Sequence, residues 1–185
     1  MGGSDVSLND VTNDGIFDLT LIEELDLNDN DNITDINHLH KLKILHVSVT
    51  DSRGDCSLGN DGIKDLELLE ELYINYNFNF TKIGSSRKLK ILDISCSGVK
   101  EIGNLPSIEK LYIDGNYSQI DVNHLRNLRV LYVCDNSNIQ NENIKDLILV
   151  EELRLDNSMH ITNIKHMTNL KILSISGKCH IDNDE

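Results

Sequence analysis

The sequence contains no tryptophan, a single proline and few other aromatic residues (Phe 3, Tyr 5). Leucine and isoleucine must therefore fill most of its interior. So little proline, together with Gly 11, excludes a collagen-like or proline-rich linker protein. No window approaches the ~18 consecutive apolar residues of a membrane span. The N-terminus also lacks the basic segment and apolar run of a signal peptide. We therefore expect a cytoplasmic protein with no membrane partner.

Basic residues are also scarce, since Lys+Arg 17 stand against Asp+Glu 31 and give a formal net charge of −14. This balance argues against nucleic acid as a partner, because phosphate binding needs clustered Lys and Arg. The cysteines follow no paired spacing, and with no export signal we expect reduced thiols. They are Cys56, Cys96, Cys134 and Cys179.

An internal repeat dominates the chain. The segment Asn60–Ile74 occurs nearly intact at Asn13–Leu27 and at Asn141–Leu155. The shorter pattern L-x-x-L-x-L-x-x-N fits eight times, starting near residues 22, 42, 69, 89, 108, 128, 150 and 170. The sequence thus predicts one domain over residues 1–185, with an incomplete unit at 1–21 around Val6–Leu8 and a loop insertion at 50–59.

This pattern resembles the leucine-rich repeat family, and the resemblance covers nearly the whole chain. The Ile33-Thr-Asp-Ile36 motif is similar to the short-repeat types, such as internalin-like and phosphatase-regulator-like proteins. The resemblance implies an α/β-type repeat solenoid, a right-handed superhelix with a concave parallel sheet of about eight strands. It also implies that the ninth-position asparagine bonds the backbone of adjacent turns. Asn30, Asn77, Asn116 and Asn136 keep this ladder, whereas Lys178 breaks it.

The spacing of apolar residues supports these expectations independently. In Leu25-Asp26-Leu27 apolar residues alternate, as in a half-buried strand. Between strands they fall at every third position, as in Ile33, Ile36, Leu39 and Leu42. A period of three is too short for an α-helix, so we expect a convex side of 3₁₀ and extended segments.

Charges alternate at the second position of the units, which reads Glu23, Lys43, Glu70, Lys90, Glu109, Arg129, Glu151, Lys171. Neighbouring strands lie ~4.8 Å apart, so opposite charges are predicted to pair along the sheet. Because a slip by one repeat would oppose like charges, this ladder is expected to set the register.

The concave face is the predicted binding site, because its outward positions are free to vary. The fifth position of the units reads Asp26, His46, Tyr73, Asp93, Tyr112, Tyr132, Arg154, Ser174. Tyrosine provides a wide apolar contact with a polar tip and is enriched at interfaces. The candidate partner-binding residues are Tyr73, Tyr76, Asp93, Tyr112, Asp114, Tyr132, Asp135 and Arg154. The alternative interpretation is that ring stacking only covers the sheet.

No catalytic, metal-binding or cofactor-binding motif accompanies these residues. The histidines are spread over different units, no zinc spacing is present, and there is no glycine-rich phosphate loop. We therefore expect a non-enzymatic interaction module that binds a protein partner, with a basic partner favoured. The alternative is the repeat segment of a larger effector or surface protein. We expect a monomer, with edge-to-edge association through the strand at Leu173–Ile175 as the other arrangement.

Overall fold

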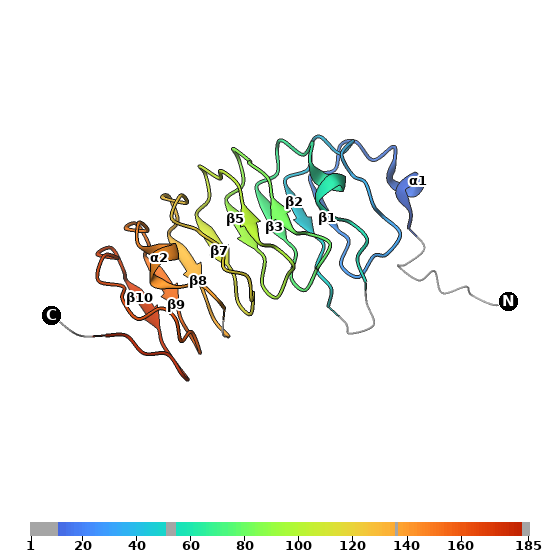
Figure 1. Ribbon diagram of the computed structural model, residues 1–185. Coiled ribbons are helices and arrows are strands. Elements are labelled where there is room, and N and C mark those ends of the chain that lie inside the picture. The colour runs from blue at the N-terminus through green and yellow to red at the C-terminus, as the bar shows by residue number, and fades with distance from the viewer. Residues whose placement is uncertain (1–10, 51–54, 136, 183–185) are drawn as a thin grey trace.

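The computed structural model describes residues 11–50, 55–135 and 137–182, and these form a parallel β-solenoid (Figure 1). Its main sheet has eight strands in the order β1-β2-β3-β5-β7-β8-β9-β10, which confirms the predicted parallel sheet. The strands are β1 Glu24–Asp26, β2 Ile44–His46, β3 Glu71–Tyr73, β5 Ile91–Asp93, β7 Lys110–Tyr112, β8 Val130–Tyr132, β9 Glu152–Arg154 and β10 Ile172–Ser174. The fragment Val6–Leu8, the ladder residue Asn136 and residues 51–54 of the insertion lie outside the described residues.

Each strand is centred on a leucine, and these leucines are aligned across the whole sheet. Leu25 pairs with Leu45 at one end, and Leu153 pairs with Leu173 at the other. The central leucines of β2 and β9 are 0% exposed, whereas the residues on either side of them face outward at least in part. The predicted alternation is therefore correct, and it encloses one continuous apolar core.

The connections between strands complete this core. Ile33, Ile36, Leu39 and Leu42 are all buried, as their three-residue spacing predicts. Two extended connections pair in parallel to make a small second sheet, formed by β4 (Lys82–Ile83) and β6 (Glu101–Ile102). These extended segments agree with the predicted connection geometry.

In the described part of the chain, three single-turn helices interrupt the connections, and each begins at the asparagine of the repeated segment. They are α1 Asn13–Ile16, the 3₁₀ helix η2 Asn60–Ile63, and α2 Asn141–Ile144. The expectation of connections without α-helix is wrong at α1 and α2. In α2 the turn is closed by a capping box, in which Asn143 Oδ1 accepts the Gln140 N–H at 2.9 Å.

The same asparagines join successive coils. Asn13 Oδ1 accepts the backbone N–H of Thr34 at 3.0 Å, and Asn13 Nδ2 donates to the Thr34 hydroxyl at 3.0 Å. Equivalent backbone bonds link Asn60 to Thr81 at 3.0 Å and Asn141 to Thr162 at 2.9 Å. The asparagine that begins each copy of the repeated segment is thus needed to join that coil to the next one.

The three ninth-position asparagines that the structure describes make the predicted ladder contacts. Asn77 is 1% exposed; its Nδ2 donates to Val47 O at 2.9 Å and its Oδ1 accepts the Asn79 N–H at 2.9 Å. Asn30 and Asn116 are likewise buried and donate to backbone carbonyls of the preceding coil. A buried amide with these partners provides hydrogen bonds to backbone groups that the turn would otherwise leave without a partner.

The residue before each ninth position adopts a left-handed conformation, which the sequence did not predict. The positive φ angles belong to Asp29, Tyr76, Cys96, Gly115, Asp135, Asn157 and Gly177. The second unit is the exception. Its residue here is Val49, whose β-branched side chain strongly disfavours positive φ. Its N–H still donates to the next strand, at Asn75 O and 2.9 Å, just as the N–H of Tyr76 donates to Ser95 O at 3.0 Å, and the insertion follows.

Opposite charges pair along much of the sheet, as predicted. Lys43 Nζ lies 2.7 Å from Glu23, and Lys90 Nζ lies 2.6 Å from Glu70. Glu151 contacts both flanking cations, Arg129 and Lys171. Within the described residues Glu109 makes no direct ion pair, so the ladder is interrupted there.

Candidate protein-binding face

The fifth-position side chains form one row across the sheet, which we call the sheet face. Strand pairing places Tyr73 beside His46 on one side and Asp93 on the other, and it places Tyr132 between Tyr112 and Arg154. The row is partly or fully exposed along its length, from Asp26 to Ser174. The predicted order of the row is therefore confirmed.

An aromatic stack occupies the part of the sheet face near β2 and β3. The rings of His46 and Tyr73 are parallel within 2°, with 4.5 Å between their centroids. The Tyr73 hydroxyl donates to Glu71 Oε2 at 2.7 Å. Burial, together with this carboxylate, raises the pKa of Tyr73 well above its ordinary value. Next to the stack, Asp93 accepts from Asn75 Nδ2 at 2.8 Å.

A second aromatic cluster covers β7, β8 and β9. The rings of Tyr112 and Tyr132 meet edge to face at 4.8 Å, and the Arg154 guanidinium lies 4.5 Å from the Tyr132 ring centroid. The Tyr132 hydroxyl donates to Glu152. Burial and then this carboxylate raise the pKa of Tyr132 to about 12. Among the described residues, none hydrogen-bonds the Tyr112 hydroxyl, which leaves this donor available to a ligand.

A groove lies where the sheet face meets the insertion. Its volume is about 890 Å³, and Tyr73, Asp93 and the exposed Tyr76 line it. His46, Asn75, Asp55 and Phe78 also line it. Phe78 is 69% exposed, a large apolar side chain at the rim of a partly acidic site. Such a combination suits a ligand that presents both apolar surface and positive charge.

Two of the predicted acidic residues lie at strand-end turns and do not line the groove. Asp114 Oδ1 accepts the Cys134 N–H at 2.9 Å, and burial raises the pKa of Asp114 above its ordinary value. Asp135 is exposed, adopts a positive φ and accepts from Asn157 Nδ2 at 3.2 Å. Both carboxylates add negative charge beside the tyrosines, and both also accept hydrogen bonds at the turns.

The prediction of the site omitted Phe78 and gave no weight to His46. The row itself contained His46, because it occupies the fifth position of the second unit. Phe78 follows the turn asparagine, and nothing in the strand periodicity marks it. It lies in the turn region after β3, which a pattern of strands does not describe.

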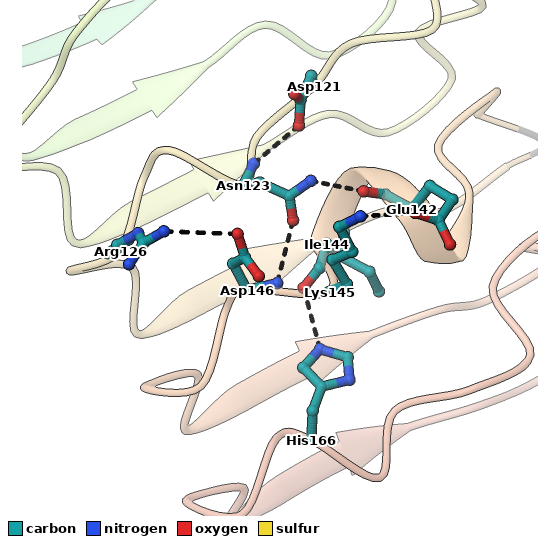
Figure 2. Close-up of polar contacts among 8 residues, drawn as sticks. All are labelled: Asp121, Asn123, Arg126, Glu142, Ile144, Lys145, Asp146 and His166. Atoms are coloured by element: carbon teal, nitrogen blue, oxygen red, sulfur yellow. Dashed lines mark hydrogen bonds and ion pairs between the residues drawn. The ribbon is translucent and has the colours of Figure 1, made fainter.

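Three histidines of the connections, His38, His124 and His166, link successive coils. His166 Nε2 donates to Ile144 O at 2.9 Å, and Figure 2 shows it next to a set of polar contacts around α2. In that set Asn123 bonds the backbone of Asp146 at 3.1 Å. His38 and His124 make the same kind of bond to a carbonyl of the preceding coil, at 3.2 and 3.0 Å.

The thiols are poorly suited to nucleophilic chemistry. Burial, helped by the Asp114 carboxylate, raises the pKa of Cys134 to about 12, and burial also raises the pKa values of Cys56 and Cys179. No disulfide joins the cysteines, all four of which are described. Among the described residues, no group of three or more His, Cys, Asp or Glu side chains is placed to hold a metal ion.

Comparison with known proteins returned no matching family model and no matching curated protein. Within the described ranges, none of the helices has the length and apolar character needed to cross a membrane.

Proposed function

We propose that this protein is a leucine-rich repeat module that binds a protein partner on its sheet face. The eight-unit sequence pattern and the buried asparagines support the leucine-rich assignment, and with it the right-handed superhelix. The observation that carries the binding function is the row of partly exposed aromatic side chains that leads into the groove.

The contact surface consists of rigid aromatic anchors. His46 and Tyr73 hold each other by stacking, while Tyr132 is held by Tyr112 and Arg154. A side chain already fixed in the free protein loses little entropy when a partner covers it. Tyrosines of this kind are typical of interaction hot spots.

The partner favoured by this surface is basic. Asp55 and Asp93 line the groove, and Asp114 and Asp135 lie beside the second aromatic cluster. The formal net charge of −14 would attract a cation-rich partner over a longer range. A lysine or arginine that enters the groove would meet both carboxylates and the faces of aromatic rings.

The same proposal assigns no catalytic step to the protein. His38, His124 and His166 bond backbone carbonyls. The raised pKa values of Cys56, Cys134 and Cys179 keep these thiols protonated near neutral pH. Neither set supplies an activated nucleophile with an adjacent base.

Affinity capture from a native lysate tests the proposal. The double variant Tyr112→Ala/Tyr132→Ala should stay folded by circular dichroism and lose the captured partner. A matched double variant, Phe17→Ala/Ile148→Ala, removes two exposed side chains away from the sheet face, 67% and 54% exposed, and should retain it. Retention of the same partner by the tyrosine variant would show that the sheet face is the wrong site.

A further inference from the structure

The two ends of the solenoid expose residues that belong to the core elsewhere. Leu173, the central leucine of β10, is 43% exposed, whereas its equivalent Leu153 is 0% exposed. At the other end Leu19 is 46% exposed, while the corresponding Leu39 is 0% exposed. Each end therefore presents apolar surface that another coil would cover.

The backbone at both ends is also arranged for pairing. Ser174 O accepts from Leu155 N at 2.9 Å, so this residue faces β9. Because facing directions alternate along a strand, the polar groups of Leu173 point away from β9. At the opposite edge Glu23 O accepts from Ile44 N at 3.0 Å, so the backbone of Glu24 points away from β2 by the same rule.

The side chains at the two edges are complementary in register. The second position alternates acid and base through the eight units, begins with Glu23 and ends with Lys171. The third position alternates as well, from Glu24 at β1 to Ile172 at β10, with isoleucine or valine in every second strand. Because the described sheet from β1 to β10 has an even number of strands, a β1 edge placed after β10 would continue both alternations without a break.

We propose that copies of this protein associate head to tail, with the β10 edge of one copy paired in parallel with the β1 edge of the next. In this register Lys171 lies beside Glu23 of the second copy, in the same base-then-acid order as Arg129 and Glu151, which form an ion pair inside one chain. Leu173 lies beside Leu25 of the second copy and is covered by it. The contact is heterologous, so each dimer keeps one free edge of each kind and can extend further.

Sedimentation velocity over a wide concentration range tests this association. The weight-average mass should rise with concentration above the 20.9 kDa of one chain, and it should pass the mass of a dimer. The variant Ile172→Asp should stay monomeric, because it places a charge on the β10 edge beside Glu24 of the next copy. Its matched control is Ile148→Asp, since both isoleucines are 54% exposed and Ile148 lies on a connection. The control should associate like the parent protein.

Mixing two blocked variants distinguishes head-to-tail pairing from any symmetric dimer. Leu19→Asp blocks the β1 end and Ile172→Asp blocks the β10 end, so each alone should be monomeric and an equimolar mixture should stop at a dimer. A parent protein that remains at 20.9 kDa at every concentration overturns the proposal. So does association of Ile172→Asp equal to that of Ile148→Asp, a measurement that holds even if Leu19→Asp fails to fold.

Discussion

The imidazole of His46 lies flat against the ring of Tyr73, at 4.5 Å between centroids and 2° between planes. The two side chains come from neighbouring strands, β2 and β3, and are separated by the insertion in sequence. Their contact fixes one wall of the groove before any ligand arrives.

This stack should contribute measurably to stability. A double-mutant cycle with His46→Ala and Tyr73→Ala should give a coupling of about 0.5–1.5 kcal/mol in the free energy of unfolding, the usual range for aromatic pairs. Urea denaturation measures it. A control cycle with His46→Ala and Tyr132→Ala should be additive within about 0.5 kcal/mol, because β2 and β8 are not adjacent. Equal coupling in both cycles would contradict a direct contact.

Removal of the buried amide of Asn77 should destabilise the solenoid strongly. Asn77→Ala leaves the buried carbonyl of Val47 without this partner, at a cost of about 1–3 kcal/mol, and it also removes the bond to the N–H of the exposed residue Asn79. Asn127→Ala is the control, since Asn127 is exposed and donates to Pro106 O at 2.7 Å. Chemical denaturation should place the control within about 0.5 kcal/mol of the parent protein. A similarly small loss of stability in Asn77→Ala would mean that the asparagine ladder does not stabilise the solenoid.

A side chain at Gly115, in its left-handed turn, should lower the stability of the protein. Its φ is +61°, and an added Cβ would lie 2.7 Å from Cys96 Sγ. The backbone conformation alone disfavours alanine by about 1–2 kcal/mol. Gly84→Ala is the matched substitution, because a Cβ there meets nothing within 4 Å. Thermal unfolding should show a lower Tm for Gly115→Ala and little change for Gly84→Ala; the reverse order would contradict the turn geometry.

The charge ladder should be visible in the titration of its carboxyl groups. A hydrogen bond and charge from Lys90 lower the pKa of Glu70, and Lys171 and Arg129 lower the pKa of Glu151. In the variant Lys90→Met, carbon-detected NMR should show the pKa of Glu70 rising toward its ordinary value while that of Glu151 stays low.

The same pair predicts a pH dependence of stability. The Glu70 pKa is lower in the folded than in the unfolded protein, so the contribution of Glu70 is complete above the ordinary Glu pKa. It is lost as the pH falls through the lowered value. The stability difference between the parent protein and Lys90→Met should therefore shrink on acidification, and a difference that grows would contradict the assigned pair.

Strand periodicity predicted most of this architecture because a central leucine in every unit determines where each strand lies. The same periodicity placed His46, Tyr73, Tyr112 and Tyr132 in one row. It could not predict the positive φ of Tyr76 or Cys96, since these residue types rarely adopt that conformation. Nor could it predict the groove, because its lining also includes Thr50, Asp55 and Phe78, which lie outside the strands.

The most direct test of the binding face is an NMR titration of the isotope-labelled protein with a partner obtained by capture. Our account predicts that amide signals change along the sheet face, at Tyr73, Tyr112 and Tyr132, and around the groove at Tyr76 and Phe78. Signals from the connections, such as those of His166 and Ile148, should not move. Changes confined to the connections, with the tyrosine strands unaffected, would contradict the proposed site.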